Sequence, residues 1–184
     1  MFLGLDLGTS ELKALLLDAR HRIVAVHGER LSVQRPQPLW SEQSPDDWWT
    51  ATDAALQHLS AAQPAAMAAV RAIGLSGQMH GAVTLDGDGK VLRPAILWND
   101  GRSGEACAAL EAAVPRLHQI AGNLAMPGFT APKLWWMREH EPALFARVRK
   151  VLLPKDWLRF RLSGECVSEM SDASGTLWLD VGAR

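Results

Sequence analysis

The chain has 184 residues, of which 48% are hydrophobic and 21% charged, values typical of a globular protein with a packed core. Its formal net charge of −1 supplies no excess cations for nucleic acid or an anionic membrane surface, so neither partner is expected. The two cysteines lie far apart, no basic and apolar leader opens the chain, and no apolar run approaches the roughly 20 residues of a membrane helix. These features predict a cytoplasmic protein of one domain, or one lobe of a larger protein.

Three strands are expected at the N-terminus. Residues 2–6 and 12–18 are apolar runs of strand length, separated by the small-residue turn Leu7-Gly8-Thr9-Ser10, and residues 23–33 can add a third strand. Because only short turns separate these strands, we expect them to pair antiparallel. Residues 70–75 predict a further short strand, and residues 82–85 and 91–96 predict a hairpin around a Gly-rich turn.

The first helix is expected to start at Ser44, as N-cap, with Pro45 in the first helical position and Asp47 in the capping-box position. Apolar residues then recur at helical spacing and predict a buried stripe facing the sheet: Trp48, Ala51, Ala55 and Leu59. Later helices are expected at residues 105–113, 130–140, 142–148 and 155–162, the last closed by Gly164.

Several familiar site patterns fail on spacing. The turn at residues 86–89 begins like a calcium loop, but Leu97 stands where the twelfth-position carboxylate is required. Residues 74–77 miss the spacing of a serine-hydrolase nucleophile elbow, and Gly89-Lys90 lacks the rest of a Walker A loop. The six histidines and two cysteines show no zinc-ligand spacing. A site that holds a metal by protein ligands alone is therefore not expected.

The turn Asp6-Leu7-Gly8-Thr9-Ser10 is the strongest local candidate for a site. A glycine lets backbone amides approach phosphate oxygens, the hydroxyls add donors, and a carboxylate at a strand end can hold hydrated Mg²⁺. Similar turns also occur in ordinary hairpins, so these five residues alone leave a purely structural reading open.

Motifs along the whole chain carry a resemblance to a known family. They are Phe2 to Ser10, Leu39-Trp40-Ser41-Glu42-Gln43, Gly77-Gln78-Met79-His80-Gly81, Ile96 to Arg102, Gly122-Asn123, Leu153 to Leu158 and Ser171 to Thr176. These segments resemble those of the FGGY carbohydrate kinases, within the superfamily that includes actin and Hsp70, and residues 128–140 fit the first signature pattern of that family. Among these kinases the likeness is greatest to those that act on xylulose.

The resemblance implies an α/β fold: an actin-like, ribonuclease H-like lobe whose mixed sheet starts with three antiparallel strands and is flanked by helices. It implies ATP and Mg²⁺ as cofactors, with Asp6 organising the metal through water and the transferred phosphoryl group. The residues implied to line the phosphate site are Gly8, Thr9, Ser10 and, as a weaker candidate, Lys13. The residues implied to bind the sugar are Gln78, Met79, His80, Trp98, Asn99 and Asp100.

Side chains near these groups are given secondary roles. Arg102 is interpreted as a support for the sugar pocket. Lys133, Trp135 and Trp136 lie in the signature but are interpreted as packing and helix-capping residues, because two adjacent tryptophans mostly bury area. His80 also retains the alternative of an ordinary structural histidine.

The resemblance further implies that residues 1–184 form an N-terminal domain and that a second lobe is absent from this sequence. Family members carry their general base, an aspartate in a Gly-Gly-Asp segment, in that second lobe, and this chain has no such segment. The complete enzyme is expected to transfer the γ-phosphoryl group of ATP to D-xylulose, to give D-xylulose 5-phosphate, and to form a homodimer. Two alternatives stay open: a non-catalytic sugar- or nucleotide-binding module, and an inactive truncated product of the same fold.

Overall fold

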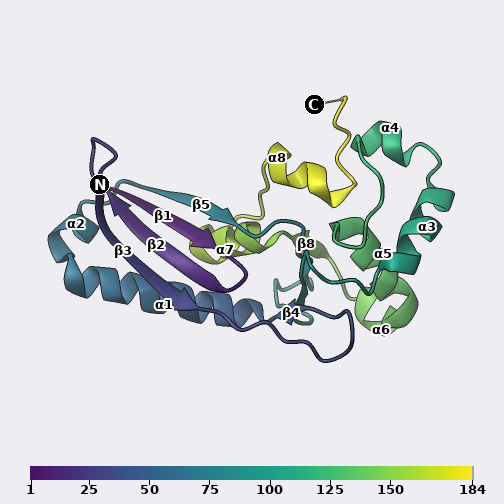
Figure 1. The fold of residues 1–184 in the computed structure, drawn as a ribbon, viewed down its shortest axis with the longest axis horizontal. Coiled ribbons are helices and arrows are strands. Elements are labelled where there is room, and N and C mark those ends of the chain that lie inside the picture. Colours follow the sequence, from purple (N-terminus) through teal and green to yellow (C-terminus); the bar gives the residue numbers. More distant parts are fainter. Residues whose placement is uncertain (184) are drawn as a thin grey trace.

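The computed structural model describes residues 1–183, and a four-stranded mixed sheet forms its N-terminal half (Figure 1). β1 (Phe2–Leu7), β2 (Glu11–Leu17) and β3 (Ile23–Arg30) pair antiparallel, and β5 (Ala72–Gly77) pairs parallel to β1, which gives the strand order β3-β2-β1-β5. The three predicted antiparallel strands are confirmed. β3 ends three residues earlier than predicted, and Gln34 then pairs with Glu42 in an isolated bridge.

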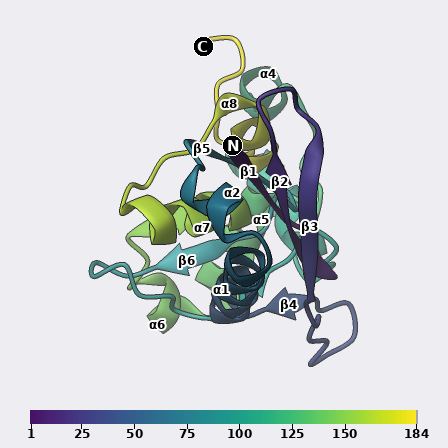
Figure 2. The same cartoon turned by 90° about the vertical axis from the view of Figure 1, so that its left-hand side faces the viewer.

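One face of the sheet carries the main core. Side chains alternate along β1 and β2, because successive residues of a strand point to opposite faces. The buried members are Leu3, Leu5, Leu7, Leu12, Ala14 and Leu16. Helices α1 (Pro45–Ala62) and α7 (Pro154–Ser163) lie on this side of the sheet (Figure 2). The predicted stripe of α1 is confirmed, since Trp48, Ala51, Ala55 and Leu59 are all buried.

The ends of these two helices differ in how well the sequence predicts them. Ser44 takes the N-cap position of α1 and Pro45 the first helical position, but among residues 1–183 the Ser44 side chain caps no backbone amide. Instead the Asp47 amide donates to the Ser44 carbonyl oxygen at 3.1 Å, so the predicted capping box is wrong. Gly164 does end α7 with a left-handed backbone (φ 76°), as predicted.

The predicted hairpin at residues 82–96 is only partly correct. Its turn forms, with the Asp86 amide bonded to the Lys90 carbonyl at 3.0 Å. Isolated antiparallel bridges also join Leu85 to Val91 and Ala82 to Ile96. However, the regular antiparallel partner of β6 (Val83–Leu85) is β8 (Lys150–Leu152), and the second predicted strand shrinks to β7 (Ala95–Ile96), which pairs with β4 (Glu42–Gln43). Both β6 and β7 thus pair with strands that are distant in the sequence, β8 and β4.

The C-terminal half is mostly helical and lies beyond the end of the sheet where β1 and β5 finish (Figure 1). Besides α7, its helices are α3 (Gly104–Ala113), α4 (Leu117–Ala121), α5 (Thr130–His140), α6 (Pro142–Phe145), α8 (Met170–Ala173) and the 3-10 turn η1 (Ser174–Thr176). The short helix α2 (Pro64–Ala68) belongs to the N-terminal half and follows α1. α6 is three residues shorter than predicted. A second core joins α3, α4, α5 and η1 through Leu110, Leu117, Phe129 and Leu177. Within residues 1–183, no helix has the length and apolar character needed to cross a membrane.

Candidate active site

The β1–β2 turn is tight and places its polar groups at one end of the sheet. The Gly8 amide donates to the Glu11 carbonyl oxygen at 3.0 Å, and a β-carbon at position 8 would approach that oxygen to 2.9 Å. Glycine is therefore required by the close approach of the backbone. Ser10 at the end of the turn is exposed.

Asp6 and Lys13 lie on the face of the sheet opposite the main core. Both side chains are exposed, and they occupy paired positions on β1 and β2, while Ser76 of β5 flanks Asp6 on its other side. The Lys13 ammonium lies 3.9 Å from the Glu11 carboxylate. One exposed carboxylate suits Mg²⁺, which keeps several waters and uses substrate phosphates as further ligands. No group of three or more His, Cys, Asp or Glu side chains within residues 1–183 is arranged to hold a metal ion.

Thr9 connects this turn to both predicted sugar-binding segments. Its hydroxyl donates to Gln78 Oε1 at 3.2 Å and accepts from the Trp98 indole Nε1 at 3.0 Å. Beneath it, the amide of Gln43 donates to the Thr9 carbonyl at 2.7 Å and accepts from Gln78 Nε2 at 2.9 Å and from Trp48 Nε1 at 3.0 Å. The sequence placed Gln43 in a resembling segment but gave it no role, since nothing local indicates partners 34 residues away.

Gln78 and Met79 face different surroundings although they are adjacent. Gln78 is buried, and its side-chain amide is used inside the network with Thr9 and Gln43. Met79 is 44% exposed and lines a cavity of about 500 Å³ together with His80. Trp98 and Asn99 are exposed as well, so these side chains are accessible to a ligand, whereas Gln78 supports them from below.

The half-buried ring of His80 forms a wall of this cavity. It packs edge-on against Phe129, with ring centroids 4.7 Å apart, and it touches the backbone of Gly175. Burial lowers the pKa of His80 below its ordinary value, and the nearby ammonium of Lys133 lowers it further. The ring is therefore neutral at pH 7, with one nitrogen as donor and the other as acceptor.

The C-terminal segment supplies the opposite side of the cavity, a role that the sequence did not indicate. Asp172, Ser174 and Gly175 of this segment line the cavity together with Met79 and His80, and Asn123, which follows α4, lines it as well. Asp172 is held by the ammonium of Lys155 at 2.6 Å, and this contact ties α8 to the start of α7.

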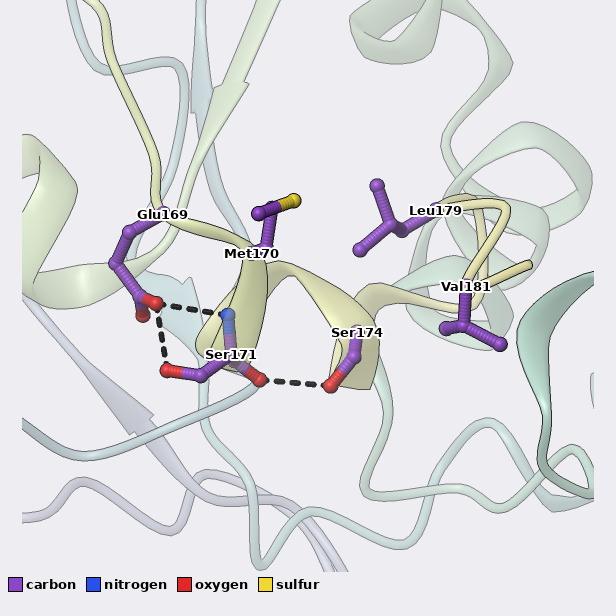
Figure 3. A pocket seen from close by; sticks show the side chains of 6 residues that line it. All are labelled: Glu169, Met170, Ser171, Ser174, Leu179 and Val181. Carbon is purple, nitrogen blue, oxygen red and sulfur yellow. Dashed lines mark hydrogen bonds between the residues drawn. The ribbon is translucent and has the colours of Figure 1, made fainter. Parts of the chain in front are cut away.

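A second cavity of about 530 Å³ lies beside α8 (Figure 3). Ser171, Ser174 and Val181 line both cavities, so the two cavities adjoin. At the start of α8, the Glu169 carboxylate accepts from the Ser171 amide at 2.7 Å and from the Asp172 amide at 2.8 Å. These bonds fix the N-terminal end of the short helix.

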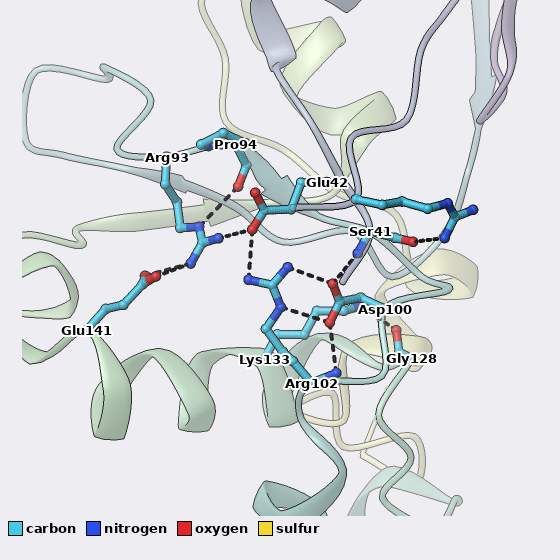
Figure 4. A network of polar contacts seen from close by, with 10 residues as sticks. Ser41, Glu42, Arg93, Pro94, Asp100, Arg102, Gly128, Lys133 and Glu141 are labelled. Carbon is cyan, nitrogen blue, oxygen red and sulfur yellow. Dashed lines mark hydrogen bonds and ion pairs between the residues drawn. The ribbon is translucent and has the colours of Figure 1, made fainter. Parts of the chain in front are cut away.

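Asp100 lies beneath the surface instead of facing the cavity (Figure 4). Its carboxylate accepts from the Ser41 amide at 2.6 Å and from the Arg102 side chain at 2.7 and 2.9 Å. Its polar capacity is thus used inside the protein, which differs from the expected sugar contact. The physical reason is that a buried carboxylate is stable only when it is paired and hydrogen-bonded.

Arg102 extends this network. Its guanidinium lies 2.7 Å from the Glu42 carboxylate and 3.6 Å from the ring centroid of Trp40. Arg93 in turn contacts Glu42 and pairs with Glu141 at 2.6 Å (Figure 4). The network joins three parts of the chain: the segment after β3, the segment on both sides of β7, and the end of α5. The loop after β7, at residues 97–102, carries Trp98 and is called the Trp98 loop below.

Comparison with known proteins places this geometry in a family. The N-terminal domain of the FGGY family of carbohydrate kinases matches residues 1–184. The chain is 55% identical to the xylulose kinase of Escherichia coli K12 over 184 residues, which is 100% of this chain and 38% of that protein.

Solved structures agree with this comparison. The crystal structure described as a xyloylose kinase from Brucella ovis matches with a TM-score of 0.96 and 55% identity, over 98% of this chain and 38% of the other. Xylulose kinase from Rhodospirillum rubrum matches with a TM-score of 0.93 and 31% identity, over the same shares. These structures confirm the predicted actin-like fold, and the chain spans little more than a third of the length of these relatives. The chain belongs to the FGGY family of carbohydrate kinases, of which it carries the N-terminal domain.

Proposed function

We propose that this chain is the sugar-binding lobe of a kinase that transfers the γ-phosphoryl group of ATP to D-xylulose. The observation that carries the proposal is the Thr9 hydroxyl, which bonds to Gln78 and Trp98 at once. A kinase must hold its phosphate donor next to its sugar, and Thr9 places the phosphate-type turn against both sugar-type segments. The xylulose kinases among the relatives supply the choice of sugar.

The side chains of the proposed sugar site suit a polyol, with Met79 and His80 lining the cavity and Trp98 and Asn99 exposed outside its lining. The neutral His80 ring donates to one hydroxyl and accepts from another, Met79 offers an apolar wall to the carbon chain, and the Trp98 indole can lie against C–H bonds. Asn99 adds an exposed amide. In this proposal Asp100 and Gln78 support the pocket from within, and Asn123 and Asp172 join its lining.

In the proposed reaction the 5-hydroxyl oxygen of D-xylulose attacks the γ-phosphorus of ATP. A new O–P bond forms, the bond from that phosphorus to the β–γ bridging oxygen breaks, ADP leaves, and the hydroxyl proton passes to a base. We place that base in the remaining part of the protein, as the family resemblance implies. Mg²⁺, when bound, neutralises developing charge on the phosphates. Asp6 would hold it through water, and Gly8, Thr9 and Ser10 would position the phosphates by their N–H and O–H donors, with Lys13 nearby.

The test is a chimera in which this chain replaces the matching segment of the E. coli xylulose kinase, assayed for ADP release with D-xylulose. His80→Ala should weaken D-xylulose by about 1 to 3 kcal/mol, the effect of losing a buried hydrogen bond. The matched control is His58→Ala, an exposed histidine of α1. A chimera that binds D-xylulose without phosphorylating it would favour a binding module, and unchanged affinity in His80→Ala would contradict the site.

Two further parts of the proposal concern the complete protein. We place its reaction in the cytoplasm, where ATP is available, and both cysteines are unpaired, with Cys107 buried and Cys166 exposed. The homodimer implied by the family resemblance stays a prediction, which sedimentation of the complete protein would test.

A further inference from the structure

Lys133 is buried to an unusual degree for a lysine. It lies in the first turn of α5 with no exposed surface, and its ammonium donates to the carbonyl oxygens of His80, at 2.9 Å, and Gly128. Fully buried lysines are rare unless polar partners satisfy them. Its burial therefore has a specific cause, and both of its bonds go to backbone atoms that border the proposed sugar pocket.

A helix-capping role does not account for this placement. A cation stabilises a helix near its C-terminal end, where backbone carbonyls are free, and is unfavourable near the N-terminal end. Lys133 occupies the unfavourable end of α5, and its partners lie outside the helix. The packing and capping role expected from the sequence therefore does not explain the hydrogen bonds of Lys133 to His80 and Gly128.

The first partner is a strained part of the pocket. His80 has a left-handed backbone (φ 62°), which side chains with a β-carbon rarely adopt. Its carbonyl oxygen accepts from Thr130 Oγ1 at 3.1 Å as well as from Lys133. Two donors from α5 thus hold the peptide group that sets the direction of the His80 ring.

The second partner connects to the Trp98 loop. A β-carbon at Gly128 would approach the Trp98 carbonyl oxygen to 2.6 Å, so the two backbones are in close contact. Lys133 bonds to Gly128 and His80 together, so it joins the His80 segment to a backbone segment that lies directly against Trp98. Through Gly128, one buried ammonium thus connects His80 to the backbone of Trp98.

We propose that Lys133 is a positioning residue of the sugar pocket, which holds His80 in its left-handed conformation and sets its distance from Trp98. This inference rests on the proposed function for the identity of the sugar. The two hydrogen bonds of Lys133 to His80 and Gly128, called the clamp below, do not depend on the ligand. Substitution of Lys133 should misplace the His80 ring even when no sugar is present.

The experiment compares the 184-residue chain with its Lys133→Met and Lys90→Met variants; Lys90 is exposed in the β6 turn and is the matched control. Circular dichroism checks folding, NMR records the His80 amide and ring signals without sugar, and calorimetry measures D-xylulose affinity. In Lys133→Met we expect shifted His80 signals and at least about tenfold weaker sugar binding, the size of losing a hydrogen bond to a charged group. Lys90→Met should match the original chain in both measurements.

Unchanged His80 signals and affinity in a folded Lys133→Met chain would overturn the inference. If that variant does not fold, Thr130→Val decides, because it removes only one bond to the same carbonyl and nearly keeps the side-chain shape. We expect it to shift the His80 signals and weaken the sugar about twofold to fivefold; unchanged signals would overturn the inference. If the original chain binds no D-xylulose, the location of the sugar pocket in this lobe is wrong, while the His80 signals still decide the clamp.

Discussion

Gly175 lies directly against the imidazole of His80, so closely that a β-carbon at position 175 would overlap ring atoms Cε1 and Nδ1. This contact brings a segment near the C-terminal end of the chain onto a histidine that follows β5. The orientation of the His80 ring is thus set on one side by Gly175 and on another by Phe129.

Gly175→Ala is expected to push the His80 ring from its position and weaken D-xylulose binding about tenfold, or ~1.4 kcal/mol. The reason is steric, because the new methyl group would need the space of the ring. Calorimetry on the 184-residue chain would measure the change. Gly104→Ala is the control, since a β-carbon there meets no atom within 4 Å. Equal affinities for both variants would contradict the role of Gly175.

Asp100→Asn separates a supporting role from direct contact with the sugar. The substitution removes one of the two carboxylates that lie 2.7 Å from the buried guanidinium of Arg102, and we expect the free energy of unfolding to fall by about 3 kcal/mol. Urea denaturation measures this, with the exposed Asp88→Asn as control. Normal stability combined with lost sugar affinity would show instead that Asp100 touches the sugar.

Asp6→Asn tests the phosphate end of the site in the chimera with E. coli xylulose kinase. We expect kcat to fall about 100-fold or more, because electrostatic groups at a transferring phosphoryl act mainly in the transition state. The KM for D-xylulose should change less than about twofold, and Asp53→Asn on the exposed side of α1 should leave both constants unchanged. Normal kcat with a raised sugar KM would refute this role.

Burial of Lys133 makes stability depend on pH. Burial lowers the pKa of Lys133 from 10.5 to about 7, so the unfolded chain binds more protons than the folded chain between these values. The free energy of unfolding contributed by this residue therefore rises with pH in that window and is lowest below about pH 7.

Urea denaturation of the original chain and of Lys133→Met, at pH 7 and pH 9, isolates this effect. The difference in unfolding free energy between the two proteins should move by about 2 kcal/mol in favour of the original chain at pH 9. Titrating groups that do not interact with Lys133 cancel in the comparison. A difference that stays constant between the two pH values would mean that the lysine keeps an ordinary pKa.

The 184-residue chain alone is expected to give no measurable D-xylulose-dependent ADP release. It covers 38% of the length of the E. coli relative, and general-base help in phosphoryl transfer, typically worth about 10² to 10⁴ in rate, is assigned to the remaining part. A coupled ADP assay with Mg-ATP and D-xylulose measures this. Turnover in the usual enzymatic range would show that these residues contain a base of their own.

Local patterns in the sequence were sufficient for the elements of the N-terminal half. Apolar runs at residues 2–6 and 12–18 predicted the first two strands, and the spacing from Trp48 to Leu59 predicted the buried face of α1. Run length and the helical period of about 3.6 residues are local features, which neighbouring residues express without distant partners. Gly164 was likewise predicted, because a left-handed helix end favours glycine.

The inner arrangement of the site required the folded chain. Three of its contacts join segments that are far apart in the sequence: Asp100 accepts from the Ser41 amide, Gln43 lies under Thr9, and Lys133 bonds to His80. Local spacing likewise did not show that β6 pairs with the distant β8, while isolated bridges still join residues 82–85 to the predicted hairpin strand. The exposure of a side chain and its hydrogen-bond partner depend on which segments pack against it in three dimensions. Residue type and local spacing do not determine that packing.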